Sequence, residues 1–453
     1  MGSGPSAFYA AEALFKQPGL EARVDMIDRM PFPFGLVRGG VAPDHQKIKG
    51  VVEVYEKIAE HEGFRFFGNV RVGRDVAARE LGDLYHMVVW AVGCESDMKL
   101  GIPGEELEGV HSATEFVGWY NAHPDHRERI FDLAGAERAA IVGNGNVAMD
   151  VARILLRDPE TLASTDIADH ALEALRRSRV REVVLLGRRG PAQAAFSPKE
   201  LEEIAALKGV HVAIEARDAA PDPLSAQWLE ERGTRSAKRN AELIASLASR
   251  PAPEPPRRLL RCRFLTSPVA IGGERRLSSV TLRRQELALD STGTPRPKPT
   301  DEVETIDVDL LFKAIGYRGV PVEGMPFDER RGIFPTEGGR LLREPGGAVM
   351  PGHYAVGWCK RGPSGLIGTN SLDSKATVEA MMEDLKAGAV PRPQEGDLAE
   401  ILRERGIDAV SWEDWARLDA WEQEQGRVRG KARHKQASVE ELMATIRALR
   451  PGS

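Results

Sequence analysis

A glycine-rich loop that leads from an apolar strand into a helix constrains this chain more than any other feature. Residues 139–142 form a short apolar run, and residues 143–148 continue it with two glycines spaced by one residue. Apolar residues at helical spacing follow from Met149 to Leu155. A strand, a glycine loop and a helix in this order let a pyrophosphate approach the backbone at the helix N-terminus. The pattern therefore predicts a dinucleotide-binding Rossmann unit that begins near Val142.

A second copy of the loop stands at the start of the chain. It supplies four candidate cofactor-binding residues, Gly2, Gly4, Ser6 and Ala7. Residues 22–27 alternate apolar and charged side chains, so we expect them to form the next strand, which ends at Asp28. In Rossmann units an acidic residue about 20 positions after the loop binds a ribose hydroxyl. With Asp28 in that place, this short motif predicts a second dinucleotide site rather than a plain turn-to-helix junction.

The first unit departs from the expected pattern in one respect. A buried apolar strand precedes the glycine loop in a parallel Rossmann sheet, whereas only Met1 precedes Gly2 in this sequence. We expect the first strand of this domain to be missing, either because the start is misassigned or because the chain is truncated. A GTG codon read as an initiator would place methionine where a valine of that strand belongs.

Two arginines indicate which dinucleotide the second loop binds. Residues 183–186 are expected to form the strand after the helix, and Arg188 and Arg189 follow where NAD-binding units carry an acidic residue. Two guanidinium groups can hold a 2′-phosphate by charge-assisted hydrogen bonds, which favours NADP over NAD. The alternative is that both are exposed arginines at the end of a strand.

Two further strand-to-glycine segments indicate the order of the domains. Residues 88–93 and 310–316 flank the second unit on either side, so we expect the second dinucleotide domain to be inserted into the first. The fold class is then α/β with two Rossmann-like domains, and we expect Val92 and Gly93 at the first cofactor. The expected limits are residues 1–100 and 321–390 for the first domain, 101–320 for the second, and 391–453 for a polar C-terminal extension.

Composition argues against several functional classes. The formal net charge is −6, whereas a nucleic-acid-binding protein needs a dominant basic surface. No apolar run reaches the roughly 18 residues of a membrane span, and no secretory signal precedes the first helix, so we expect a soluble cytoplasmic protein. Three widely spaced cysteines argue against a metal or iron–sulfur centre. Cys94 and Cys359 each lack the second thiol that a disulfide reductase needs.

One segment is locally basic. Only Glu242 and Glu254 oppose its basic side chains, which are Arg232, Arg235, Lys238, Arg239, Arg250, Arg257, Arg258, Arg261 and Arg263. Two interpretations are open: a solvated helix and loop, or a docking surface for an acidic partner.

Two longer motifs point to a family. Together with both glycine loops, the segments 39–45 (GGVAPDH) and 357–370 (GWCKRGPSGLIGTN) make the chain resemble the adrenodoxin-reductase type of ferredoxin-NADP reductase, especially its actinobacterial members. The resemblance covers nearly the whole chain. It implies FAD in the first domain, NADP(H) in the second, and electron transfer from NADPH through FAD to an acidic ferredoxin-type iron–sulfur protein, or the reverse.

The resemblance also implies roles for individual residues. Contacts to the flavin ring are implied for Trp358, Gly365, Leu366 and Ile367, and further FAD contacts for Gly35 and Leu36. The NADPH pyrophosphate is expected along Asn144, Gly145, Asn146 and Val147, with Glu200 at the adenosine ribose. His45 and Glu203 match positions proposed for proton handling or electron-transfer geometry near the flavin. Without the family, Trp358 is a core aromatic, His45 a loop histidine and Glu203 a helix-surface glutamate.

Two other functions are kept as alternatives. One is an NADPH-oxidising subunit that feeds electrons into a larger complex, although such subunits usually carry cysteine-rich cluster ligands that this chain lacks. The other is an NADP-binding regulatory protein that lacks FAD.

Overall fold

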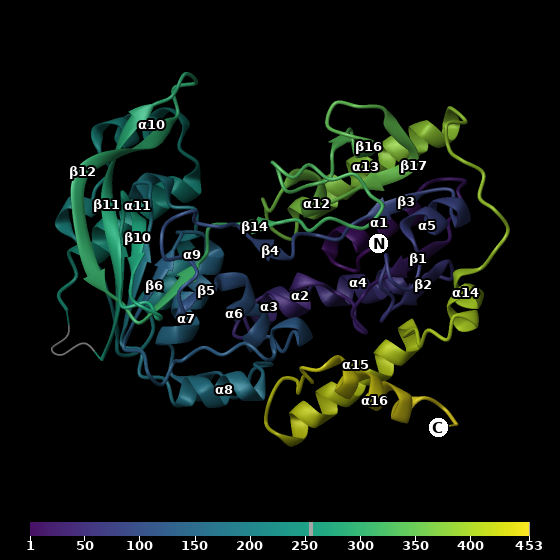
Figure 1. Cartoon of the computed structure of the whole chain (residues 1–453), viewed down its shortest axis with the longest axis horizontal. Helices are drawn as coiled ribbons and strands as arrows, with labels where there is room; N and C mark the ends of the chain where they lie inside the picture. The colour runs from purple at the N-terminus through teal and green to yellow at the C-terminus, as the bar shows by residue number, and fades with distance from the viewer. Residues whose placement is uncertain (253–256, 453) are drawn as a thin grey trace.

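The computed structural model describes residues 1–252 and 257–452. Two α/β units lie side by side, and in Figure 1 the C-terminal helices lie below and beside the right-hand unit, which contains the N-terminus. A short antiparallel ribbon of β4 (Ser96–Asp97) and β14 (Tyr317–Arg318) lies where the chain passes between the units. The two Rossmann-like α/β units that the sequence predicts are confirmed. Within the described ranges, none of the helices combines the length and the hydropathy of a membrane-spanning segment.

The second unit is built on a six-stranded parallel sheet. In spatial order its strands are β5 (Val110–Ser112), β13 (Leu310–Lys313), β6 (Arg138–Val142), β7 (Glu182–Leu186), β9 (Arg258–Arg263) and β8 (Val210–Ile214). β6 and β7 lie inside the sheet and are buried on both faces, which is why they read as continuous apolar runs. The helices of this unit are α6 (Ala113–Tyr120), α7 (Asn146–Leu156), α8 (Asp169–Arg176), α9 (Pro198–Ala205), α10 (Pro223–Arg232) and α11 (Arg235–Ala248).

An antiparallel sheet that the sequence analysis does not predict packs on this unit. Its strands are β10 (Thr266–Gly272), β11 (Ser279–Leu289) and β12 (Pro295–Asp307). Val280 and Leu282 of β11 pack with Val142 and Leu186 at the ends of β6 and β7. β12 lies on the outside and most of its side chains are exposed.

The first unit has its sheet in two parts. In one part, β1 (Val24–Ile27) pairs in parallel with β2 (Phe64–Phe67). In the other, the spatial order is β3 (Val88–Trp90), β17 (Val349–Ala355), β16 (Arg340–Leu342) and β15 (Thr336–Glu337). The helices are α1 (Pro5–Phe15), α2 (Leu36–Gly39), α3 (Gln46–Lys49), α4 (Val52–Ala59), α5 (Ala78–Leu84), α12 (Trp358–Arg361) and α13 (Thr369–Lys386).

The first residues of the chain lie between these two parts. The Met1 amino group donates to the Val89 carbonyl at 2.8 Å, and the Met1 carbonyl accepts from the Ala91 amide at 2.7 Å. On the other side, the Gly2 amide donates to the Ile27 carbonyl at 2.8 Å. These bonds hold the loop against the ends of β1 and β3.

The C-terminal extension is part of the first unit's core. It forms α14 (Leu398–Glu404), α15 (Trp412–Val428) and α16 (Val439–Leu449). Trp415 and Leu418 of α15 and Ile446 of α16 are buried in the same cluster as Phe34 and Phe66. The extension is polar in composition, but one face of each of these two helices is apolar and packs against the unit.

A buried ion pair joins α15 to the short helix α2. Glu422 is fully buried and accepts hydrogen bonds from both terminal nitrogens of Arg38, at 2.5 and 2.8 Å. Arg433 adds a third bond to Glu422 at 3.0 Å. Phe32 and Trp415 lie against the Arg38 guanidinium, with ring centroids 4.5 and 5.2 Å away.

This arrangement predicts that Glu422 contributes strongly to stability. Glu422→Gln should destabilise the protein by about 3–5 kcal/mol, because the buried guanidinium of Arg38 loses its counter-charge. The matched variant Glu424→Gln removes the partner of Arg427 from an exposed pair on the same helix, and it should cost only about 0–1 kcal/mol. Urea unfolding followed by tryptophan fluorescence measures both, and equal losses would contradict the prediction.

Candidate functional site

One large cavity brings the predicted site residues together. It has a volume of about 1860 Å³ and is lined by residues of both units. All of the predicted site residues line it except Ala7 and Glu203. Ala7 is buried in the core of the first unit instead, and its contact with a cofactor stays a prediction. Its position in the motif serves close packing between helix and strand.

The first glycine of each loop lies against a strand-end carbonyl in the same way. Gly2 has φ +90°, and a Cβ atom there would lie 2.4 Å from the Ala91 carbonyl oxygen. Gly143 has φ +126°, and a Cβ atom there would lie 2.2 Å from the Ala314 carbonyl oxygen. Only glycine fits such an approach. The segments at 88–93 and 310–316 are thus equivalent parts of the two units.

Both loops present a helix N-terminus to the cavity. The N-cap residues of α1 and α7 are Gly4 and Gly145, which have no side chain to cap the helix. The amide groups that lack a partner at each helix start are therefore available to an anion, which the helix dipole also attracts. Pro5 at the start of α1 has no amide group, so α1 offers fewer donors. This geometry suits a pyrophosphate at each loop.

Asp28 lines the cavity in a fixed orientation. Its Oδ2 accepts from the amide and the hydroxyl of Ser3, at 2.9 and 2.6 Å, and its Oδ1 accepts from the Met30 amide at 2.9 Å. Ser3 is a site residue that the sequence motifs did not predict. Its position between two glycines, in a motif paired with an acidic residue, is the signal that could have found it.

Arg188 and Arg189 form a positively charged wall of the cavity at the end of β7. In the described part of the chain neither pairs with a carboxylate, whereas the nearby Arg296 pairs with Asp290 at 2.9 Å. Burial and the charges of Arg188 and Arg296 lower the pKa of Arg189. The wall therefore carries positive charge that protein groups do not compensate.

His45 and Glu203 come from different units and meet at the cavity. His45 Nε2 lies 2.8 Å from Glu203 Oε2 of α9, and His45 Nδ1 lies 3.9 Å from Asp150 of α7. Burial alone would raise the pKa of Glu203, but the hydrogen bond and charge of His45 lower it. Glu203 is therefore ionised at neutral pH, so His45 Nε2 carries the proton and donates to it.

A buried arginine organises the acids around His45. The Arg153 side chain is 1% exposed and donates to Asp44 at 2.7 and 3.1 Å, to Asp150 at 2.5 Å and to Glu200 at 2.8 Å. Burial raises the pKa of Asp150, and burial with the charge of Asp150 raises that of Glu200. The sequence analysis missed Asp150 and Arg153. As polar residues within the apolar pattern of α7, they could have been singled out.

The start of α12 and the loop that follows this helix form another wall of the cavity. Trp358 is only partly buried, and its Nε1 donates to the Ser364 carbonyl at 3.2 Å. Its ring lies beside that of Tyr317, with centroids 5.3 Å apart. The interpretation of Trp358 as a core aromatic is therefore disfavoured. Gly365 has φ +82°, which few other residues adopt, and Leu366 next to it is 69% exposed.

The locally basic segment does not form one exposed surface, which corrects the expectation of a docking surface over its whole length. Its last part is β9, a strand inside the sheet, where Arg261 pairs with Glu182 and the buried Arg263 pairs with Glu304. Glu254 lies outside the described residues. The basic side chains that stay exposed on α11 are Arg235, Lys238 and Arg239.

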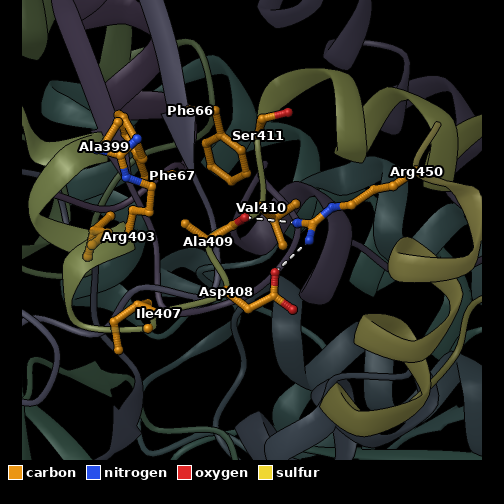
Figure 2. A pocket seen from close by; sticks show the side chains of 12 residues that line it. Phe66, Phe67, Ala399, Arg403, Ile407, Asp408, Ala409, Val410, Ser411 and Arg450 are labelled. Carbon is orange, nitrogen blue, oxygen red and sulfur yellow. Dashed lines mark hydrogen bonds and ion pairs between the residues drawn. The ribbon is translucent and has the colours of Figure 1, made fainter. Parts of the chain in front are cut away.

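A smaller cavity of about 420 Å³ lies between β2 and the C-terminal helices (Figure 2). Phe66 and Ile407 contribute apolar walls, and Arg450 donates to Asp408 at 2.6 Å and to the Ala409 carbonyl at 3.0 Å. None of the predicted site residues lines it. The candidate site is therefore the large cavity.

Known proteins resemble the chain over nearly its whole length. The pyridine nucleotide-disulphide oxidoreductase family matches residues 1–217, which contain both glycine loops. NADPH-ferredoxin reductase FprA of Mycobacterium tuberculosis is 46% identical over 98% of this chain and 97% of its own. The mitochondrial NADPH:adrenodoxin oxidoreductase of Arabidopsis thaliana is 43% identical over 98% and 94%.

A solved structure agrees with the sequence relatives. The structure of Mycobacterium tuberculosis FprA in complex with NADPH superposes with a TM-score of 0.92 at 44% identity, and 98% of each chain is covered. The similarity extends through both units and the C-terminal helices. The chain belongs to the adrenodoxin-reductase type of NADPH-ferredoxin reductases.

Proposed function

We propose that this protein transfers electrons between NADPH and a ferredoxin-type iron–sulfur protein through bound FAD. The observation that carries the proposal is that two equivalent glycine loops, one in each unit, open onto one cavity. Dinucleotides bound at both loops meet in that cavity. The names of the relatives, NADPH-ferredoxin reductase and NADPH:adrenodoxin oxidoreductase, support the same activity.

The first unit holds FAD in this proposal. When bound, FAD accepts two electrons from NADPH and releases them singly, as an iron–sulfur partner requires. The N-terminus of α13 follows the loop after α12, so the dipole of this helix would stabilise negative charge on the reduced cofactor. The residues assigned to FAD are Gly2, Gly4, Ser6, Asp28, Gly35, Leu36, Val92, Gly93, Trp358, Gly365, Leu366 and Ile367.

The second unit holds NADPH. The residues assigned to its pyrophosphate are Asn144, Gly145, Asn146 and Val147, and those assigned to its 2′-phosphate are Arg188 and Arg189. The ribose contact of Glu200 stays a prediction, since Arg153 binds its carboxylate. His45, oriented by Glu203, holds a proton at the cavity beside the reacting rings.

The ribbon of β4 and β14 supports the domain limits. Because residues 96–97 pair with residues 317–318, the chain enters the second unit near residue 100 and leaves it near residue 320. We therefore keep residues 1–100 and 321–390 as the FAD domain, and residues 101–320 as the inserted NADP domain.

The proposal is tested by the visible spectrum of the protein. The purified protein, reconstituted with FAD, should be yellow, and anaerobic NADPH should bleach its flavin band. Added ferredoxin should then restore the band. A protein that stays colourless after incubation with FAD would overturn the proposal in favour of a regulatory NADP-binding protein.

The positively charged wall predicts the choice of coenzyme. A hydrogen bond to a charged group contributes roughly 1.5–3 kcal/mol, so Arg188→Ala or Arg189→Ala should raise the KM for NADPH by about ten- to a hundredfold. The 2′-phosphate is remote from the hydride, so kcat should change little. NADH lacks this phosphate, and its use should be unaffected.

Steady-state reduction of a dye by each coenzyme measures the effect. Arg250→Ala, in the same unit but away from the cavity, is the control. An equal loss with NADH and NADPH would mean that the arginines support the fold rather than the phosphate.

We also propose that the acidic partner docks on α11. Ser236 in the first turn of this helix lines the cavity, so a protein bound to Arg235, Lys238 and Arg239 would lie beside the cavity mouth. In the described residues Lys238 forms no ion pair, and Arg239 pairs with Glu202 and Glu242. Lys238 therefore offers a charge that a partner's carboxylates can neutralise.

Charge reversal at Lys238 should slow electron transfer to an acidic ferredoxin. Lys238→Glu should lower kcat/KM on the order of tenfold at low salt, because electrostatic steering is lost. The difference should shrink at 0.15 M salt, where the Debye length is about 8 Å. Arg250→Glu, beyond the other end of α11, is the matched control, and reduction of a small neutral dye should not respond to either change. If both variants behave alike, the partner docks elsewhere.

A further inference from the structure

We propose that residues 429–437, the C-terminal clamp, fix the orientation of the second unit relative to the first and so the approach of nicotinamide to flavin. This inference rests on the proposed function and assigns a role to the part of the extension that joins α15 to α16. The proposal is based on one observation: the clamp makes contacts with both units.

The clamp is anchored to the first unit at both of its ends. It leaves α15 and returns into α16, and both helices are packed into the first unit's core. Arg433 also pairs with the buried Glu422, which holds Arg38. The clamp therefore moves as part of the first unit.

The middle of the clamp binds the second unit around the start of α8. The Ala432 amide donates to the Ser164 carbonyl at 2.8 Å, and Lys431 donates to the Ile167 carbonyl at 2.8 Å and pairs with Asp169. Ala437 is buried in the core cluster of the second unit. In Figure 1 the yellow loop before α16 lies beside one end of the blue α8.

Lys435 closes the clamp on a buried carboxylate of the second unit. Its side chain is 1% exposed, and its Nζ lies 3.0 Å from Asp166 Oδ2. Asp166 also accepts from Lys49 at 2.6 Å and from Gln46 at 2.8 Å, both in α3 of the first unit. Burial opposes the ionised form of Asp166, but the charges of Lys435 and Lys49 lower its pKa. The clamp and α3 thus bind the same carboxylate of the second unit.

The contacts of α3 and the clamp lie close in sequence and space to the candidate site. His45 directly precedes α3, and the preceding Asp44 pairs with Arg153 and Arg157 of α7. The covalent connection between the units runs only through the β4/β14 ribbon, so rotation there must break the contacts of α3 and of the clamp. Misplacing reacting groups by about 1 Å can cost a hundredfold in rate. Loss of electrons from the flavin to a small oxidant needs no such alignment between units.

The test compares two half-reactions in Lys435→Met and in Lys431→Met, a milder variant at the other clamp contact. In Lys435→Met, flavin reduction at saturating NADPH should slow by about tenfold, since alignment is lost. Reoxidation by ferricyanide should stay within about twofold, and Lys435→Arg should recover part of the rate because it keeps the charge. Lys431→Met should also slow flavin reduction, but by a smaller factor than Lys435→Met. Arg427→Gln, which breaks an exposed pair on α15, is the control.

A distance measurement tests the clamp without turnover. Spin labels at Glu62→Cys and Lys208→Cys lie on exposed positions of the two units, and the native cysteines are buried. The parent and the Arg427→Gln variant should give one narrow distance distribution, and Lys435→Met a broader one. If Lys435→Met leaves both the distance distribution and the rate of flavin reduction unchanged, the proposed role of the clamp is wrong. It is also wrong if this variant slows flavin reduction and reoxidation by ferricyanide equally. If NADPH fails to reduce the parent flavin, the proposed function fails, whereas the distances still decide on the clamp.

Discussion

The close approach of a glycine backbone to a strand-end carbonyl is the contact on which both binding sites depend. It occurs at Gly2 with Ala91 and at Gly143 with Ala314. Any side chain would push the loop away from the sheet, and the N-terminus of the following helix would no longer face the cavity. Because the same contact is built twice, the two units present equivalent anion sites. The reacting ends of two dinucleotides can then meet in the space between the units.

The interface between the units is ionic where it borders the reacting site. Arg153 pairs with acidic residues from a loop of the first unit and from two helices of the second. Asp166 pairs with Lys49 and Lys435. Buried ion pairs gain little net free energy because desolvation offsets their attraction, but they tolerate few geometries. An apolar interface would allow sliding, whereas here each charge has a fixed partner. Orientation is therefore the property that these contacts can secure.

Local patterns predicted what lies within one stretch of chain. The strand, loop and helix around Gly143 and the fold class are confirmed. Asp28 and Arg188 line the cavity, as their spacing after each loop predicts. Contacts between segments that are distant in sequence could not be predicted from local patterns. Examples are the pairs Arg153 with Asp44 and Lys435 with Asp166, and the antiparallel sheet beside β6. The exposure of the basic segment was wrongly predicted for the same reason. Counting charges from Arg232 to Arg263 could not reveal that Arg261 and Arg263 lie on an internal strand opposite glutamates from β7 and β12.

The two uncapped helix N-termini link the stability of the folded protein to the binding of its cofactors. α1 and α7 direct partial positive charge into one cavity, beside two uncompensated arginines, so like charges face each other until phosphate groups arrive. Cofactors bound there act as counter-ions as well as reactants. A ligand at a hundredfold excess over its Kd stabilises the folded state by about 2.7 kcal/mol. On the proposed function, FAD and NADP(H) therefore stabilise the folded protein as well as taking part in its reaction.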